Sequence, residues 1–142
     1  MGLVYTLGTS TRTWEEFVAL LKYLGVEVVV DVRRFPTSRF EYFQKEELAR
    51  LLPKEGIAYS HLGERLGGYR RGGYQAFLAR EEFRRGLEEV EEIARERKTA
   101  IVCAERLPWR CHRRFIGMEL ERQGWQVIHV IDERRSWKSK EG

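Results

Sequence analysis

Residues 99–116 read TAIVCAERLPWRCHRRFI, and this stretch decides the fold. Thr99 to Cys103 is short, apolar and rich in β-branched residues, which is typical of a strand buried on both faces. Pro108 excludes a helix from the following connection. From about Cys111 the apolar residues recur at helical spacing, so we expect a helix to begin there. The stretch therefore predicts a buried strand, a polar turn and a helix.

The first turn of this expected helix is rich in basic and nucleophilic side chains: Cys111, His112, Arg113 and Arg114. Free backbone N–H groups point outward at a helix N-terminus, and at the carboxyl end of a parallel strand they bind anions. The sequence thus indicates an anion site at this turn. The alternative is a solvated basic turn with two cysteines packed in the core.

Strands and helices alternate through the rest of the chain. Strands are expected at residues 3–7, 26–32, 57–62 and 125–131, and helices at 13–24, 45–52 and 75–97. We expect Thr9, Ser10 or Thr11 to supply the N-cap of the helix that begins near Thr13, and Gly25 to supply its C-cap. This order predicts an α/β fold, a three-layer Rossmann-like domain with a mostly parallel sheet of about five strands. We expect a single domain over residues 1–142, with a basic tail that frays from about residue 133.

The composition fits a globular protein of the cytoplasm. Hydrophobic residues make up 42% of the 142 residues, and the net charge is +4. The sequence contains no apolar run long enough to cross a membrane and no signal peptide, and its two cysteines are expected to be reduced thiols. Arginine outnumbers lysine and asparagine is absent, a thermophile-like composition in which some arginines serve surface ion pairs.

Two loops add further candidates for a binding site. Asp31 ends an apolar strand, where a buried carboxylate needs a partner, so we expect a nearby arginine or backbone amides to pair with it. The residues after it, to about Phe43, mix aromatic and basic side chains in a way that suits base stacking. The glycine-rich stretch 66–74 is a candidate lid, but its spacing matches no phosphate-binding fingerprint, and no cofactor is expected.

Several short motifs resemble those of a prokaryotic family, the domain of unknown function numbered 488. They are Thr6-Leu7-Gly8-Thr9-Ser10, Asp31-Val32-Arg33 with Pro36 and Ser38-Arg39, Leu66-Gly67-Gly68, and Cys103-x-Glu105 with Pro108 and Cys111-His112-Arg113. The resemblance implies an α/β architecture and a pocket, but no reaction. Two departures stand out: Thr9 stands where relatives often carry histidine, and the Asn-Pro usual after Ser38-Arg39 is missing.

Most of these motifs follow expected strands, and the carboxyl ends of parallel strands share one edge of a sheet. We therefore expect one pocket and an enzyme that acts on a phosphate-bearing small molecule or nucleic acid. The predicted substrate-binding residues are Ser10, Asp31, Arg33, Ser38, Arg39, Glu105 and Arg113. His112 is expected to move protons. A non-catalytic nucleotide or nucleic-acid binding module and a thiol redox switch between Cys103 and Cys111 are the alternatives. No zinc-like spacing is present, so no metal is expected.

Either cysteine could be the nucleophile, and the sequence favours Cys111. A helix dipole and neighbouring arginines would lower the pKa of Cys111, whereas burial at a strand end would leave Cys103 inert. A phosphatase-like arrangement would select Cys103, but it requires an arginine six positions later, where Trp109 stands.

Overall fold

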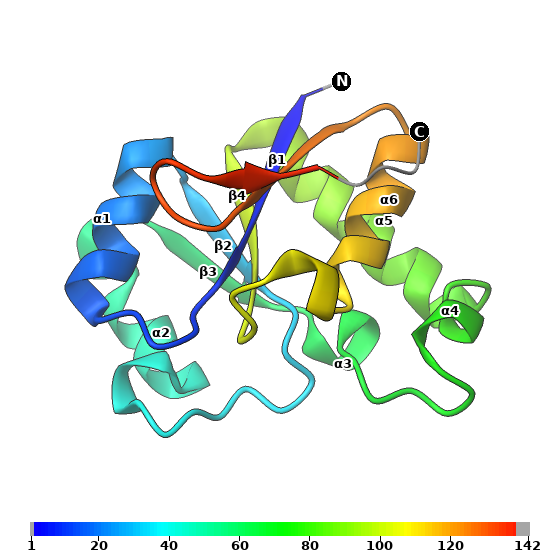
Figure 1. The fold of residues 1–142 in the computed structure, drawn as a ribbon, viewed down its shortest axis with the longest axis horizontal. Helices are drawn as coiled ribbons and strands as arrows, with labels where there is room; N and C mark the ends of the chain where they lie inside the picture. Colours follow the sequence, from blue (N-terminus) through cyan, green and yellow to red (C-terminus); the bar gives the residue numbers. More distant parts are fainter. Residues whose placement is uncertain (1, 139–142) are drawn as a thin grey trace.

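The computed structural model describes residues 2–138, which form one mostly parallel sheet with helices packed against it (Figure 1). The strands are β1 (Leu3–Gly8), β2 (Val28–Asp31), β3 (Ala58–His61), β4 (Thr99–Cys103), β5 (Gln126–Val130) and β6 (Ser136–Trp137). Their order across the sheet is β3-β2-β4-β1-β5-β6. The first five pair in parallel, as predicted, and β6 pairs antiparallel with β5.

The helices are α1 (Trp14–Leu24), α2 (Lys45–Leu51), α3 (Gly63–Leu66), α4 (Tyr74–Phe77), α5 (Glu81–Glu96) and α6 (Arg113–Arg122). Successive residues of a strand point to opposite faces of a sheet, and the core is accordingly divided into two clusters. Val29 packs with side chains of α1 and α2, whereas its neighbours Val28 and Val30 pack with side chains of α5 and α6. Mixed α/β architecture is therefore correct.

The ends of α1 agree in part with the prediction: Gly25 is the C-cap as expected, but the N-cap is Thr13 and not Thr9, Ser10 or Thr11. Thr13 and Glu16 form a reciprocal capping box, in which each side chain accepts the backbone N–H of the other residue. Gly25 closes the helix in the left-handed conformation at φ 74°, which a glycine adopts without strain.

The helix expected over residues 75–97 is interrupted. It consists of α4, a turn and α5, with Arg80 in extended conformation between them. Apolar residues keep helical spacing across this break. Tyr74, Phe77 and Phe83 nevertheless pack together as an aromatic cluster, which holds the two helices as separate segments.

The tail also differs from the prediction. Arg134 and Arg135 donate their backbone N–H groups to Asp132, and this turn returns the chain to form β6. Trp137 then packs on His129 with ring centroids 5.3 Å apart. An aromatic contact thus orders a segment whose polar composition predicts fraying; residues 139–142 lie outside the described part. No helix within residues 2–138 is long and apolar enough to cross a membrane.

Candidate functional site

Three loops meet at the carboxyl edge of the central strands. The backbone N–H of Thr9, after β1, donates to Cys103 O at 2.8 Å, and that of Val32, after β2, donates to Val102 O at 2.9 Å. Gly8 is required at this junction, because a Cβ there would lie 1.9 Å from the Glu105 carbonyl oxygen. The register of the sheet therefore brings segments far apart in sequence to one place.

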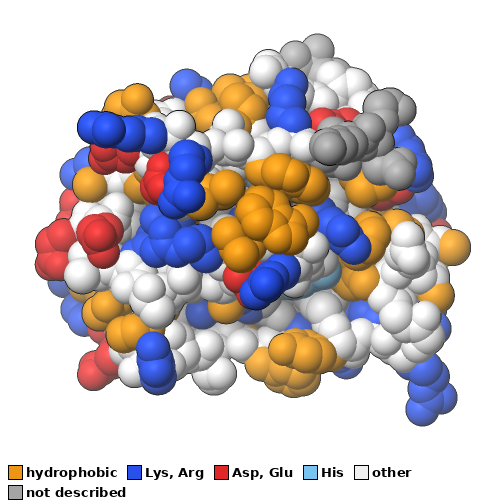
Figure 2. Space-filling view, viewed as in Figure 1, with side chains coloured by type: hydrophobic (Ala, Val, Ile, Leu, Met, Phe, Trp, Pro, Cys, Tyr) orange, Lys and Arg blue, Asp and Glu red, His pale blue; other side chains and the backbone are white. Residues whose placement is uncertain are grey.

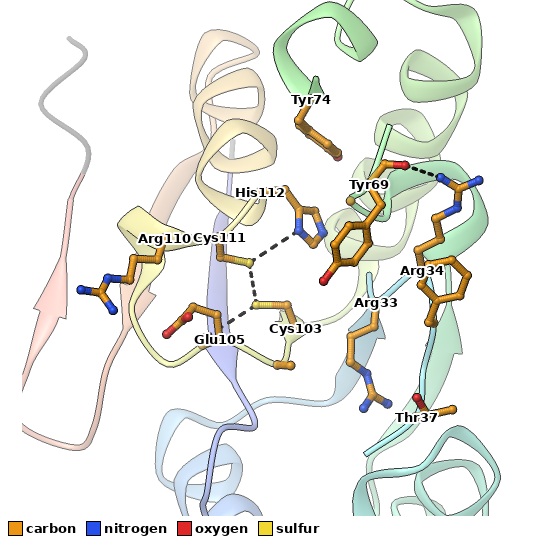
Figure 3. Close-up of a pocket in the computed structure, with 13 residues that line it drawn as sticks. Arg33, Arg34, Thr37, Tyr69, Tyr74, Cys103, Glu105, Arg110, Cys111 and His112 are labelled. Atoms are coloured by element: carbon orange, nitrogen blue, oxygen red, sulfur yellow. Dashed lines mark hydrogen bonds between the residues drawn. The ribbon is translucent and has the colours of Figure 1, made fainter. Parts of the chain in front are cut away.

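A cleft of about 790 Å³ opens at this edge (Figure 3). Its walls come from the loop after β2, the loop between α3 and α4, and the segment between β4 and α6. The lining residues are Arg33, Arg34, Phe35, Thr37, Gly68, Tyr69, Tyr74, Cys103, Ala104, Glu105, Arg110, Cys111 and His112.

The two cysteines form a contact in the wall of this cleft. Their Sγ atoms lie 2.8 Å apart as free thiols, and Arg113 Nη1 donates to Cys103 Sγ at 2.8 Å. Burial alone raises the pKa of Cys103, but the Cys111 hydrogen bond and the charge of Arg113 outweigh burial and lower that pKa to about 7. The same hydrogen bond, together with burial, raises the pKa of Cys111. The surroundings thus favour the thiolate on Cys103 and the thiol on Cys111.

These surroundings favour a thiolate on Cys103, whereas the sequence favoured one on Cys111. The helix α6 begins at Arg113, two residues later than expected, because Cys111 is extended and His112 takes the N-cap position. The Arg113 backbone N–H reaches Cys111 Sγ at 3.5 Å, but the Arg113 guanidinium contacts Cys103. The contact of the Arg113 guanidinium with Cys103 therefore outweighs the effect of the helix N-terminus on Cys111. Sequence spacing does not reveal this contact.

An external anion could not reach the Arg113 side chain. Its side chain is fully buried, and its nitrogens donate to Thr6 Oγ1, Cys103 Sγ and two backbone carbonyls, those of Glu105 and Arg106. The prediction that Arg113 binds substrate is therefore corrected: it is an internal cation that stabilises the Cys103 thiolate.

His112 lines the cleft beside Cys111. Its Nε2 lies 3.2 Å from the Val32 carbonyl oxygen, a geometry that assigns the proton to Nε2 and leaves Nδ1, 3.6 Å from Cys111 Sγ, as an acceptor. Burial lowers the pKa of His112 to about 4. His112 is neutral near pH 7, so it acts there as a proton acceptor.

A second buried ion pair supports the opposite wall. Asp31 accepts Arg33 Nε at 2.9 Å and Arg33 Nη2 at 2.7 Å, and it also accepts the Arg33 backbone N–H and the Tyr59 hydroxyl. The arginine and the backbone amide predicted as partners of Asp31 are thus both present. Within residues 2–138, Arg33 Nη1 has no hydrogen-bond partner.

The remaining predicted residues divide into two groups. Glu105 lines the cleft, and its carboxylate accepts the Leu107 backbone N–H. Ser10, Ser38 and Arg39 are not among the lining residues: Ser10 Oγ accepts from Arg106, Ser38 Oγ accepts the Phe40 backbone N–H, and Arg39 lies over the Phe40 ring.

The predicted site residues leave out the aromatic and basic rim of the cleft. Phe35 and Tyr69 are 63% and 85% exposed, with ring centroids 6.0 Å apart. Arg34 holds the two loops together, because it donates to the Tyr69 carbonyl oxygen at 2.6 Å and lies 5.7 Å from the Phe35 ring centroid. On the face drawn in Figure 2, basic side chains surround exposed apolar ones. Two sequence signals could have identified this rim: the aromatic and basic composition of the loop after β2, and the glycine-rich pattern of the loop between α3 and α4.

No group of three His, Cys, Asp or Glu side chains within residues 2–138 is arranged to hold a metal ion. The cleft is therefore defined by thiols, a neutral histidine, arginines and aromatic rings.

Comparison with curated proteins and with solved structures finds no match. A family model, that of the domain of unknown function DUF488, matches residues 13–120 and so covers most of the chain. This range contains the cleft-lining residues and both cysteines. The chain therefore belongs to the DUF488 family.

Proposed function

We propose that the protein is an enzyme that acts on a phosphate-bearing substrate, a nucleotide or a nucleic acid, with Cys103 as its nucleophile. The observation that carries the proposal is the contact between Arg113 Nη1 and Cys103 Sγ in the wall of a basic cleft. A thiolate is the reactive form of cysteine, and a neighbouring cation populates it at neutral pH.

The charge of the cleft supports a phosphate-bearing substrate. Three arginines line the cleft, and Glu105 is the one carboxylate among the lining residues. Arginine suits phosphate because its planar group offers several donors at once. Arg33 is held rigidly by Asp31 and keeps Nη1 without a protein partner in residues 2–138, so a small rearrangement would present that nitrogen to an anion.

The aromatic rim supports a base on the same substrate. Phe35 and Tyr69 expose their rings at the mouth of the cleft, and every nucleobase can stack on an aromatic ring. The cleft volume lies in the range typical of small-ligand sites, which favours a mononucleotide over a long strand.

The proposed chemistry assigns a role to each inner residue. Cys103 attacks an electrophilic centre of the substrate, and Arg113 keeps the sulfur ionised until then. His112 Nδ1 is an acceptor for the proton of Cys111. This assignment requires substrate to reach a sulfur whose residue is only 1% exposed, so binding must open the inner wall.

A binding module without catalysis is the second candidate, and the deep burial of Cys103 is the observation that favours it. Its ligand would occupy the aromatic rim alone. Thermal-shift screening of a nucleotide panel, followed by product analysis of every binder, separates the two candidates.

The matched variants are Cys103→Ser and Phe35→Ala. Under the enzyme proposal, Cys103→Ser retains the nucleotide-induced rise in Tm and loses turnover, whereas Phe35→Ala weakens both. Binding with no turnover by the wild type would establish the module instead. The absence of any nucleotide-induced shift would reject both.

Two further expectations from the sequence remain proposals. We propose that the sheet and its helices form a three-layer, Rossmann-like arrangement, and that the protein works in the cytoplasm, where the thiols would stay reduced.

A further inference from the structure

The Sγ atoms of the two cysteines lie together, although seven residues separate Cys103 from Cys111. Both cysteines line the cleft, but Cys103 is only 1% exposed, so a small oxidant reaches its sulfur when the inner wall opens. Their Sγ atoms lie 2.8 Å apart, and Arg113 Nη1 donates to Cys103 Sγ, so the surroundings favour the thiolate on Cys103 and the thiol on Cys111. A nucleophilic sulfur thus has a second thiol already beside it.

We propose that Cys103 and Cys111 are a peroxide-reactive dithiol, in which Cys103 is the residue oxidised first and Cys111 the residue that resolves it into a reversible disulfide. The geometry meets the requirements of that chemistry: an ionised sulfur, a cation that holds it, and a second sulfur within reach. The proposal shares Cys103 with the proposed enzyme but does not depend on any nucleotide substrate.

The first step consumes one hydroperoxide. The Cys103 thiolate attacks the terminal oxygen, an S–O bond forms, and the O–O bond breaks. The sulfur loses two electrons, and the leaving alkoxide or hydroxide takes a proton to become alcohol or water. Arg113 Nη1 lies 2.8 Å from Cys103 Sγ and orients the sulfur for this attack.

The second step forms the disulfide. Cys111 attacks the Cys103 sulfenic acid, an S–S bond forms, and the S–O bond breaks. The departing hydroxide and the Cys111 proton leave as water, and His112 Nδ1, 3.6 Å from Cys111 Sγ, is an acceptor on the path of that proton. An external dithiol such as dithiothreitol reverses the reaction by thiol–disulfide exchange.

The reaction would be tested on the reduced full-length protein with hydrogen peroxide at low molar excess. Samples are denatured in N-ethylmaleimide and weighed by intact mass spectrometry. We expect the wild type to change from two maleimide labels to none, with the mass loss of two hydrogens, and dithiothreitol to restore both labels. A non-reducing gel must show monomer only.

Two variants assign the order of the steps. Cys111→Ser is expected to trap a sulfenic acid on Cys103, detected with dimedone, whereas Cys103→Ser lacks the sulfur that Arg113 Nη1 contacts and is expected to react at least about tenfold more slowly with peroxide. Circular dichroism confirms that each variant is folded, and the urea-unfolded wild type, in which the contact is lost, provides the baseline rate.

The proposal is overturned if peroxide leaves both thiols available to maleimide, if it links two chains, or if it drives Cys103 to sulfinic acid without a disulfide. It is equally overturned if folded protein forms the disulfide no faster than unfolded protein. None of these outcomes bears on nucleotide turnover, which is measured separately on the reduced enzyme.

Discussion

Arg113 Nη1 lies 2.8 Å from Cys103 Sγ, so the cation that stabilises this thiolate comes from the first residue of the helix that follows its strand. Protein groups surround the Arg113 guanidinium, because it also donates to Thr6 Oγ1 and to two carbonyl oxygens. The charge is therefore fixed in place and cannot be replaced by a neighbouring arginine.

Arg113→Met is expected to raise the pKa of Cys103, because a buried thiolate loses its cation. Alkylation of Cys103 by iodoacetamide at pH 7, followed in a Cys111→Ser background, should slow on the order of tenfold for each unit by which the pKa rises. Arg114→Met is the matched control, since Arg114 stacks on the Phe115 ring. Equal alkylation rates in the two variants would contradict the role given to Arg113.

Asp31→Asn is expected to destabilise the fold by about 3–5 kcal/mol, because it leaves the buried Arg33 charge without its counter-ion. Tyr59→Phe is the control: it removes one hydrogen bond to the same carboxylate and should cost about 1 kcal/mol. Urea unfolding monitored by circular dichroism measures both. Similar losses in the two variants would show that the ion pair is not the main support of this wall.

Acid is expected to weaken the fold through two histidines. Burial lowers the pKa of both His112 and His129 to about 4, while an unfolded histidine titrates near 6.5. The unfolded chain therefore binds protons first, so this stability is complete above pH 6.5 and is lost as the pH falls towards 4.

The loss should be on the order of 2 kcal/mol for each histidine. Urea midpoints measured from pH 7 to pH 4 test this expectation, and His129→Gln should flatten the pH dependence even if it lowers stability throughout. A wild-type midpoint that stays constant over this range would count against it.

Gly8→Ala is expected to disrupt the edge of the sheet at the site, since the new Cβ would meet the Glu105 backbone at 1.9 Å. Gly56→Ala is the control, because a Cβ at Gly56 would enter open space. Only the positive φ of Gly56 strains the alanine, which should lower the free energy of unfolding by on the order of 1 kcal/mol. A Tm loss no larger for Gly8→Ala than for Gly56→Ala would indicate that the β1 end shifts freely.

The sequence predicted those features of the fold that depend on local residue chemistry and on the spacing of apolar residues. The Gly25 terminus and the five parallel strands follow from short patterns, and buried Asp31 needed a partner, which Arg33 supplies. Convergence of the loops followed from the parallel order alone.

The inner site depended on contacts between distant residues. Arg113 reaches Thr6, more than a hundred positions away, and its burial could not be inferred from a basic helix start. The contact between Arg113 and Cys103 follows from that placement, and it favours Cys103 as the thiolate where the sequence favoured Cys111. The break before Glu81 likewise depends on aromatic packing, which helical periodicity does not encode.

The short strand β6 has a practical consequence for work on this protein. Trp137 packs on His129 and also on Trp109, with ring centroids 5.9 Å apart, and Trp109 belongs to the turn that carries Arg110 into the cleft. The far end of the chain thus braces the segment that presents the reactive cysteines. A purification tag or a truncation that disturbs Ser136–Trp137 would alter the site from outside it, so a negative assay of a tagged preparation would say little about the proposed activity.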